Sequence, residues 1–341
     1  MTVQKIDSKS ENGGTQPLRV VSITDSGYAS RCAVMLESSG VGDLTTVLSL
    51  DEGVHRLLQA FPKLQVTDWN EFLRANPAVA RSIKGRSRAE SIFSVGPSFL
   101  LSQVDQVDPE GWLVYADADL FFFSSMVEYL NSHPRSNVVI SPHRHHAWNV
   151  GRLAKYGKYN VGLVAFRNNS EGIKALKFWA KSCLEWCKDK PENGKYADQK
   201  YLESFAKISQ GVFEDYSRGV NLAPWNSWFT RVSRNVKGEL YAGDKPLVYF
   251  HAQGLRRTRR SWVLGHLNYF ALANYSIRRF IYTPYVRQLE GWNSRFGLGG
   301  NASSRSPLGA ARQILATLNL YLSLLLRQTI ASENMPKESR I

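Results

Sequence analysis

The sequence is poor in cysteine, in acidic residues and in long apolar runs, and each shortage narrows the class of protein. Three cysteines in 341 residues (Cys32, Cys183 and Cys187) are too few for a disulfide framework and fit a reducing compartment. Cys183 and Cys187 are four residues apart in a stretch with helical patterning. Since no other paired cysteines occur, we interpret them as small buried apolar residues rather than metal ligands. Residues 1–17 lack the apolar segment of a secretory signal and predict a loose polar tail.

Two nucleotide-binding motifs are also missing. No Gly-x-Gly-x-x-Gly follows the first predicted strand, which argues against a dinucleotide-binding fold. No Gly-Lys-Ser/Thr loop occurs, which argues against a P-loop ATPase. The sequence shows no internal repeat.

Acidic residues are scarce above all near the C-terminus. The chain has 43 Lys and Arg against 29 Asp and Glu, a formal net charge of +14. From Leu255 to Ile341 there are 13 basic and 3 acidic residues, so +10 of the net charge lies in this segment. A basic and aromatic segment indicates an anionic partner, such as a membrane surface, an acidic glycan, a nucleic acid or nucleotide phosphates.

Short apolar and β-branched runs alternate with helical patterning from residue 18 onward. Strands are predicted over 18–23, 45–50, 112–116, 137–141, 161–166 and 247–251. Helices are predicted over 28–38, 52–60 and 172–186, with helical patterning over 75–101 that is interrupted at Gly96-Pro97. This alternation implies an α/β protein with a mostly parallel, Rossmann-like sheet flanked by helices. We divide the chain into a flexible tail (1–17), a main domain (18–260) and a basic, aromatic helical extension (261–341).

Polar side chains follow three of these strands. They are Thr24 and Asp25, then Asp117 and Asp119, and finally His251. Because ligands bind at the carboxyl ends of parallel strands, these positions are expected to converge. If the strand continues through 117–119, both carboxylates point to the same side, where crowded like charges need a positive partner. A hard divalent cation is the natural partner, and a solvated acidic turn is the alternative.

Four stretches carry a resemblance to a known family. They are Asp117-Ala118-Asp119 after an apolar strand, the run 158–167 with Asn160 and Gly162, the run 196–202 with Asp198 and Gln199, and the run 247–254 with His251 and Gly254. In order and spacing, across about residues 18–260, they resemble the GT-A glycosyltransferases, in particular a bacterial branch similar to the glycogenin and galactosyltransferase-like family eight.

The resemblance implies a role for each matching residue. Asp117, Asp119 and His251 would hold a divalent metal, and an oxygen-rich site with one imidazole suits Mn²⁺ better than Mg²⁺. Asn160, Asp198 and Gln199 would contact the donor sugar at the reacting centre. A nucleotide-sugar donor, with a UDP-sugar favoured, would be bound by Thr24, Asp25, Arg88, Asp117, Ala118, Gly254 and Arg256.

Several of these residues also have structural interpretations. His251 could be a hydrogen-bonded histidine at a strand end, and Gly162 could mark a strand kink rather than a close approach. Asp198 could cap a helix, which is compatible with a sugar contact. Arg86, which precedes Arg88 in a run similar to the family's basic helix, is interpreted as part of a solvated turn. Arg257 is an alternative to Arg256 at the diphosphate, and Arg259 and Arg260 are interpreted as solvated.

Aromatic and histidine-rich stretches indicate an acceptor side. Trp225 beside Pro224 is either a platform for a sugar face or ordinary core packing. His143, His145 and His146 lack a neighbouring cysteine or carboxylate, so we interpret them as an acceptor-side loop rather than a zinc site.

The function that the resemblance implies is metal-dependent transfer of a sugar, of the hexosyltransferase type, from a nucleotide-diphosphate sugar to a hydroxyl acceptor, with retention of anomeric configuration. A bacterial glycan, such as a lipopolysaccharide, or a lipid-linked glycan is the expected acceptor. A nucleotidyltransferase acting on sugar phosphates is an alternative, but the Gly-rich basic loop that it needs after the first strand is not supplied by residues 24–28. A nucleic-acid-binding protein is a further alternative, although no recognised module supports a nucleic-acid partner.

The apolar run 314–326, between Arg312 and Arg327, is too short to span a bilayer. It could lie in a membrane interface with its arginines on lipid head groups. Equally, it could dock on the main domain or on a partner in a homodimer. We expect a cytoplasmic protein, with peripheral contact to the inner face of the plasma membrane as an option.

Overall fold

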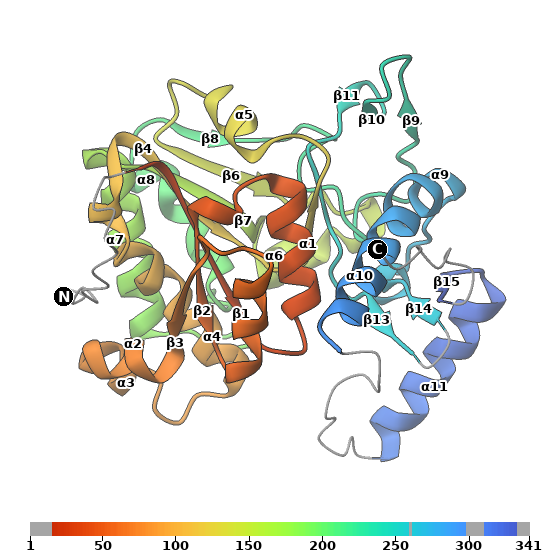
Figure 1. Ribbon diagram of the computed structural model, residues 1–341, viewed down its shortest axis with the longest axis horizontal. Coiled ribbons are helices and arrows are strands. Elements are labelled where there is room, and N and C mark those ends of the chain that lie inside the picture. Colours follow the sequence, from red (N-terminus) through yellow and green to blue (C-terminus); the bar gives the residue numbers. More distant parts are fainter. Residues whose placement is uncertain (1–15, 259–260, 298–309, 333–341) are drawn as a thin grey trace.

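A seven-stranded sheet forms the centre of the protein (Figure 1). The computed structural model describes residues 16–258, 261–297 and 310–332. Six of the strands run in one direction, and the fifth in spatial order is antiparallel to both of its neighbours. The prediction of a mostly parallel sheet is therefore confirmed. In spatial order the strands are β3 (Gln65–Asp68), β2 (Thr45–Ser49), β1 (Gln16–Thr24), β4 (Val107–Ala116), β7 (Tyr159–Arg167), β6 (Val138–Pro142) and β8 (Val212–Glu214).

Helices cover both faces of this sheet, as expected. Successive strand residues point to opposite faces, so Val20 and Val114 belong to one apolar core while Val21 and Leu113 belong to the other. The first core includes α1 (Ala29–Ser39) and α10 (Thr283–Arg295), and the second includes α4 (Arg88–Leu101) and α7 (Ser170–Glu185). The shorter helices are α2 (Trp69–Ala75), α3 (Pro77–Ser82), α5 (Met126–Asn131), α6 (Gly151–Tyr156), α8 (Phe205–Ile208) and α9 (Tyr275–Ile277).

The predicted interruption at Gly96-Pro97 is wrong. Helix α4 runs through both residues, and the break falls between α3 and α4 instead. Ser87 begins α4 with a capping box, in which its side chain and that of Glu90 each accept a backbone N–H. Gly96 lies against the Tyr115 ring, where a Cβ atom would be only 2.9 Å from the ring. Packing against β4 therefore outweighs the one backbone hydrogen bond that Pro97 removes.

Two other predicted elements differ in detail. Residues 52–60 form a 3₁₀-helix (Glu52–Gln59) capped by Asp51, not an α-helix. The last predicted strand is shorter than expected, β12 (Tyr249–His251), and lies outside the main sheet. It pairs antiparallel with β5 (Leu120–Phe122), a strand that the sequence did not reveal. The interpretation of Cys183 and Cys187 as buried free cysteines is confirmed.

The C-terminal part of the chain packs beside the main sheet. One small sheet contains β9 (Val232–Arg234), β10 (Leu240–Ala242) and β11 (Lys245–Pro246), and another contains β13 (Arg256–Arg257), β14 (Ser261–Val263) and β15 (Thr329–Ala331). The β13–β14 ladder pairs residues on both sides of the proposed domain boundary at 260. The boundary itself stays a prediction. The expected apolar helix near the C-terminus is α11 (Ala310–Leu325). None of the described helices is long and apolar enough to cross a membrane.

Candidate metal and donor site

The chain turns sharply between β4 and β5, and this turn carries the two carboxylates. Strand β4 ends at Ala116, so the strand does not continue through 117–119 as the simplest expectation required. The Asp117 N–H donates to the Gly162 carbonyl at 2.8 Å, and the Ala252 N–H donates to the Asp119 carbonyl at 3.0 Å. These bonds fix one end of the turn to β7 and the other end to the residue that follows β12. Buried Ala118 lies between the two acidic residues.

His251 meets both carboxylates. Its Nε2 atom is 3.1 Å from Asp119 Oδ1 and 3.6 Å from Asp117 Oδ2. The β5–β12 ladder makes this meeting, because it places His251 directly opposite Leu120, the residue after Asp119. In residues 16–258, 261–297 and 310–332 these three side chains are the one group of three or more His, Cys, Asp and Glu close enough to share a metal ion, with ligand atoms within 4.8 Å of one another.

Asn160 determines which ring nitrogen of His251 faces the carboxylates. The Gly162 N–H donates to Asn160 Oδ1 at 3.1 Å, so the amide atom there is the acceptor oxygen. The same oxygen is 2.9 Å from His251 Nδ1, which must then carry the hydrogen. A neutral imidazole in this tautomer directs the Nε2 lone pair toward Asp117 and Asp119. Metal-binding histidines are oriented in this way by a partner on the other ring nitrogen.

Gly162 and Trp225 hold His251 in this position. A Cβ atom on Gly162 would lie 2.6 Å from His251 Nδ1 and 2.7 Å from Asn160 Oδ1. The close approach that we expected at Gly162 is therefore made by the histidine. On another side, the Trp225 ring packs edge-on against the imidazole with ring centroids 5.4 Å apart. Trp225 is fully buried, so it acts as core packing, and no face of this ring is open to a sugar.

The electrostatics of the cluster follow from burial and crowding. Burial raises the pKa of Asp117 to about 6, the His251 ring opposes that rise, and the Asp119 carboxylate adds to it. Burial also opposes ionisation of Asp119, but His251 and, less strongly, the Arg31 guanidinium hold its pKa below the usual value. Burial disfavours a charged His251, and the two carboxylates outweigh this effect and raise its pKa. The raised pKa of Asp117 therefore comes first from burial, with the neighbouring Asp119 carboxylate as a smaller cause.

This donor set fits a divalent cation. Two carboxylates and one imidazole are ligands that Mn²⁺ and Mg²⁺ accept, and the imidazole favours Mn²⁺. The hydrogen bond from Nδ1 to Asn160 makes Nε2, the nitrogen that faces the carboxylates, the atom that would coordinate a metal ion. His251 is also a hydrogen-bonded histidine at a strand end, as the structural alternative expected. The two interpretations are compatible, because the hydrogen bond to Asn160 is the contact that orients the ring.

Asn160 reaches this edge of the sheet because β7 runs opposite to its neighbours. Its position opposite Ser141 near the end of β6 brings the beginning of β7 to the carboxyl ends of β4 and β6. Asn160 therefore has a structural role that the sequence did not reveal, in addition to the predicted contact with a sugar.

Asp198 is buried near the cluster, and the side chain of Gln199 is held in place by a hydrogen bond. Burial and then the charge of Asp117 raise the pKa of Asp198 to about 8, so its carboxyl is neutral at pH 7. The residue occupies the N-cap position of a 3₁₀-helix (Gln199–Ser204), but its side chain makes no capping hydrogen bond. Trp179 Nε1 donates to the Asp198 carbonyl at 3.0 Å, and Gln199 Nε2 donates to the Tyr156 carbonyl at 2.6 Å.

The residues at the end of β1 also gather here. Arg88 donates to Asp25 at 2.9 Å, so the two predicted donor contacts form an ion pair, largely exposed on the arginine side. Thr24 is buried. The ring of Tyr28 lies within the field of Asp25, Asp117 and Asp119, which places the end of β1 and the beginning of α1 beside the carboxylate–histidine cluster.

Arg86 is not part of a solvated turn, and that interpretation is wrong. Its guanidinium donates to the carbonyls of Cys183 at 2.7 Å and Leu184 at 2.6 Å, and it contacts the Ser94 hydroxyl. These carbonyls lie in the last turn of α7, where helix carbonyls lack intrahelical partners. Arg86 therefore caps α7 and joins it to α4, a long-range contact that no local pattern predicts.

Gly254 and the arginines after it lie on the C-terminal side of the site. Gly254 has a φ of +78°, and a Cβ atom would be 3.0 Å from Asn268, so glycine is required by the backbone. Arg256 lies in β13, half-buried, opposite Val263. Arg257 pairs with Glu290 at 2.9 Å, which makes it a structural residue. Arg259 and Arg260 lie outside the described residues.

Sequence reasoning missed Arg31 on α1. Its guanidinium lies over the Tyr28 ring, 4.4 Å from the centroid, and donates to the Leu255 carbonyl at 2.9 Å. Its charge lowers the pKa of Asp119, so it is a cation beside the cluster. Helix α1 approaches the β5 strand only in the folded chain, where the Phe122 N–H donates to Ser38 at 3.1 Å. No sequence signal marks this arginine.

The histidine-rich loop belongs to a double layer of rings. His143 is buried and stacks on His145 at 4.9 Å, and both contact Trp225. Farther out, His146 stacks on Trp148 at 4.7 Å, and Trp228 stacks on Phe229 at 5.1 Å. Trp148 and Phe229 are exposed. We name the outer group the aromatic ledge: His146, Trp148, Trp228 and Phe229.

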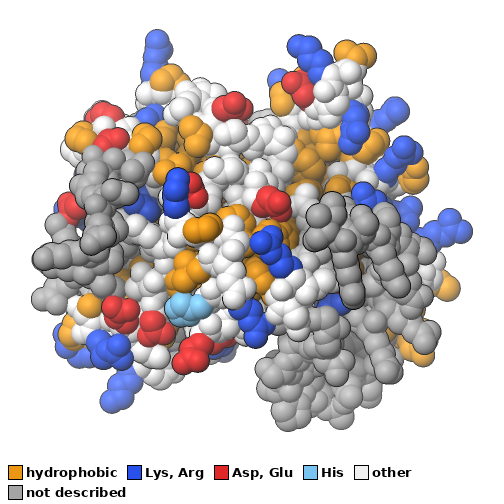
Figure 2. Space-filling view, in the orientation of Figure 1, with side chains coloured by type: hydrophobic (Ala, Val, Ile, Leu, Met, Phe, Trp, Pro, Cys, Tyr) orange, Lys and Arg blue, Asp and Glu red, His pale blue; other side chains and the backbone are white. Residues whose placement is uncertain are grey.

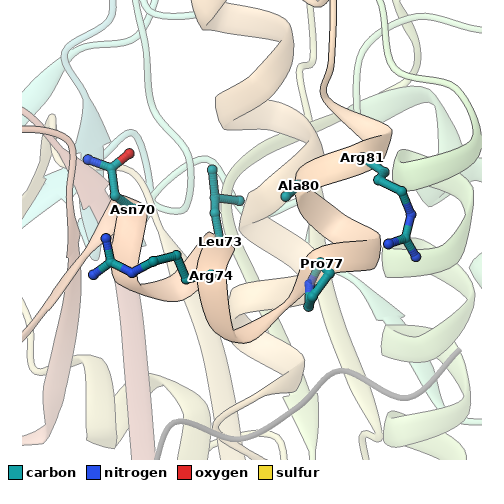
Figure 3. Close-up of a pocket in the computed structure, with 6 residues that line it drawn as sticks. All are labelled: Asn70, Leu73, Arg74, Pro77, Ala80 and Arg81. Atoms are coloured by element: carbon teal, nitrogen blue, oxygen red, sulfur yellow. The ribbon is translucent and has the colours of Figure 1, made fainter.

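An open hollow of about 610 Å³ lies elsewhere, on α2 and α3 (Figure 3). Leu73, Pro77 and Ala80 line its apolar part, and Asn70, Arg74 and Arg81 line the rest. None of the clustered carboxylate and histidine residues contributes to it. The hollow therefore has no role in the chemistry described above.

Fold and site together define an α/β protein with a candidate divalent-metal centre at the carboxyl edge of a mostly parallel sheet. No protein-family model matches the chain. Two uncharacterized proteins of Bacillus subtilis (strain 168) are similar in sequence. YfnD is 27% identical over 249 residues, 72% of this chain and 79% of the relative. YfnF is 26% identical over 218 residues, 62% of this chain and 71% of the relative.

Several solved glycosyltransferase structures are similar at low identity. The galactosyltransferase LgtC in complex with donor and acceptor sugar analogs is 14% identical, with a TM-score of 0.48, over 81% of this chain and 99% of that chain. The bifunctional glycosyltransferase WbbM is 10% identical, with a TM-score of 0.45, over 86% of this chain and 53% of that chain. Mouse xyloside xylosyltransferase 1 is 10% identical, with a TM-score of 0.41, over 70% and 98%. The function proposed for this chain therefore depends on its own site.

Proposed function

We propose that this protein is a metal-dependent glycosyltransferase of the GT-A type that uses a nucleotide-diphosphate sugar. The observation that carries the proposal is the meeting of Asp117, Asp119 and His251, with the histidine tautomer prepared by Asn160. A second support is that all four sequence stretches that resemble the family contribute to this one region of the fold. We also propose that the protein belongs to family eight of these enzymes and to its bacterial branch.

A divalent cation at this site, with Mn²⁺ favoured, would bind the donor diphosphate and stabilise the negative charge that develops as the nucleoside diphosphate leaves. The chain's own residues would orient the donor. Arg31, whose charge lowers the pKa of Asp119, would add positive charge near a bound diphosphate. Thr24 and Asp25, at the end of β1, would contact the nucleoside, and a UDP-sugar is the favoured donor.

Sugar contacts are assigned to Asp198, Gln199 and Asn160. A neutral Asp198 carboxyl can donate a hydrogen bond to a hydroxyl as well as accept one. Gln199 keeps its carbonyl oxygen as a second acceptor, since its amide nitrogen is bound to Tyr156. Such contacts hold the ring while the acceptor hydroxyl attacks. Retention of configuration and hexosyl transfer remain part of the proposal, and no protein nucleophile is assigned.

The acceptor is proposed to be a glycan, free or lipid-linked, that approaches over the aromatic ledge. Both segments that carry the ledge begin beside the metal ligands. The loop 143–149 follows β6, whose Ser141 pairs with Asn160, and the loop 223–231 follows Leu222, whose carbonyl accepts the His251 N–H at 2.8 Å. Exposed aromatic rings next to a polar site suit the apolar face of a sugar ring.

The direct test is thermal stabilisation by UDP-, GDP-, ADP- and CMP-sugars, each with and without Mn²⁺. We expect a shift with one nucleotide that EDTA removes and that Asp119→Ala abolishes. Asp244→Asn, an exposed acidic residue outside the site, is the matched control and should keep the shift. No shift with any donor would overturn the proposal. Stabilisation by a sugar 1-phosphate with a nucleoside triphosphate, but by no nucleotide-sugar, would favour the nucleotidyltransferase.

A further inference from the structure

Helix α11 presents an apolar stripe to water. Leu318, Tyr321, Leu322 and Leu325 follow one another at the three- and four-residue spacing of one helix face. All four are exposed, Leu325 at 80% and Tyr321 at 68%, and Leu326 beside them is exposed as well. In Figure 1, α11 lies at the periphery of the molecule beside β13–β15, with the main sheet on the far side of them.

The opposite face of α11 meets the protein through Ser323, with half-buried Asn319 and Leu320 on the same side. Ser323 is fully buried, and its carbonyl accepts the N–H of Gln328 at 2.6 Å. Gln328 in turn is buried and binds the Ala273 N–H through Oε1 at 2.6 Å. Directly after it, β15 pairs with β14. The helix is thus anchored by polar contacts and strand pairing.

This orientation argues against one of the sequence alternatives. A helix that docks on its own domain buries its apolar face and exposes its polar face. Among the residues of α11 whose side chains are described, 318–325, most of the leucines are instead exposed, and the one fully buried side chain is that of Ser323. The apolar stripe is therefore available to something outside the main domain.

Positive charge beside the stripe indicates what that partner is. Arg278, the first residue of a π-helix (Arg278–Tyr282), donates to the Arg327 carbonyl at 3.1 Å, which places its guanidinium against the end of α11. Arg278 and Arg327 are therefore cations at the same end of the stripe, and the exposed Arg279 follows Arg278 directly in the chain. Figure 2 shows basic side chains at the upper right, where α9 and β9–β11 lie in Figure 1. The segment from Leu255 onward carries 13 basic and 3 acidic residues.

This positive charge distinguishes two candidate partners, a second copy of the chain and a lipid surface. A second copy of the chain would bring two sets of arginines together across the contact, which is unfavourable. An anionic lipid surface neutralises them, while its acyl region accepts the leucines. We propose that α11 lies in the interface of an anionic bilayer, with Leu318, Tyr321, Leu322 and Leu325 in the apolar region and the arginines at the head groups.

The test is vesicle co-sedimentation of the full chain, with phosphatidylglycerol-containing vesicles against pure phosphatidylcholine vesicles. We expect binding to the anionic vesicles that weakens as salt is raised. Leu318→Ser with Leu322→Ser and Leu325→Ser should reduce binding at least tenfold, and Arg279→Gln with Arg327→Gln should weaken it and flatten its salt dependence. Val150→Ser with Val236→Ser, which changes exposed apolar residues outside α11, is the control and should bind normally.

Each other outcome would overturn the proposal. No binding to anionic vesicles at low salt would do so, as would binding that the α11 variant leaves intact. A concentration-dependent dimer that the leucine variant dissociates, with no vesicle binding, would assign the stripe to a second copy instead. Thermal unfolding of the variants checks that the fold is retained. None of these outcomes depends on donor binding, so they are independent of the glycosyltransferase proposal.

Discussion

Asn160 Oδ1 accepts the hydrogen of His251 Nδ1 at 2.9 Å, so the nitrogen that faces Asp117 and Asp119 is Nε2. The bond joins the antiparallel strand of the main sheet to the separate β5–β12 ladder. A metal site built in this way depends on a residue that need not itself touch the ion, and the first prediction tests that dependence.

Asn160→Ala should weaken Mn²⁺ binding about 10- to 100-fold, because the ring loses the partner that fixes its tautomer and orientation. Asn160→Asp keeps an acceptor oxygen in place and should restore most of the affinity. Isothermal titration with Mn²⁺ alone measures both without any substrate. Equal affinities in the wild type and Asn160→Ala would show that the tautomer is set by other contacts.

Gly162→Ala should damage the site more than its size suggests. The new Cβ would lie 2.6 Å from His251 Nδ1, so the imidazole must move away from Asp119. We expect a loss of about 1–3 kcal/mol in the free energy of unfolding and loss of the Mn²⁺-dependent thermal shift. Gly151→Ala is the matched control, since a Cβ there meets nothing within 4 Å. Mn²⁺ binding that survives Gly162→Ala would contradict the packing described.

Arg86→Ala should destabilise the fold without touching metal affinity. The variant leaves the carbonyls of Cys183 and Leu184 without their donor and separates α4 from α7. We expect about 3 kcal/mol of lost stability in urea unfolding, with Mn²⁺ titration unchanged. Lys84→Ala, which changes an exposed basic residue of the same turn, is the matched control and should alter stability little. A metal defect in Arg86→Ala would assign this arginine to the site instead.

Trp148→Ala should affect the acceptor and not the donor. Removing a ring from the aromatic ledge should raise the acceptor KM about tenfold, while nucleotide release from the donor in water stays the same. Phe270→Ala, an exposed ring outside the ledge, is the control. The measurement is nucleotide release with and without glycan acceptors. A change in the water reaction would place Trp148 at the donor instead.

Acid should destabilise the protein through His143 and His266. Burial lowers the pKa of each imidazole to about 3. In the unfolded chain both titrate near 6.5, so between about pH 6.5 and 3 the unfolded state binds more protons and stability falls with falling pH. At pH 4 each histidine should have cost roughly 3 kcal/mol relative to pH 7. Urea unfolding at pH 7, 5 and 4 measures this, and His266→Gln should show a shallower loss than the wild type. Equal slopes in both proteins would exclude His266 as a source.

Local patterns predicted those parts of the protein whose cause is local. The apolar run of β4 followed by two acidic residues, and the helical spacing in α1 and α7, were recognised because they depend on neighbours in sequence. The sequence did not predict that Glu52–Gln59 forms a 3₁₀-helix instead of an α-helix. It also did not predict that α4 continues through Gly96 and Pro97, because that continuity depends on packing against β4. The role of Arg86 was missed for the same reason, since its partners lie on α7.

The sequence by itself determined the sheet-and-helix class and the spacing of Asp117 and Asp119, and the resemblance to a known family pointed to His251 as their partner residue. Only the tertiary structure decided that β7 runs antiparallel and carries Asn160 to the carboxyl edge, that β12 leaves the main sheet to deliver His251, and that α11 turns its leucines outward. The physical reason is that strand direction, strand pairing and helix orientation are set by contacts between distant segments. A pattern along the chain reports which residues are apolar or charged, and the fold alone determines what they face.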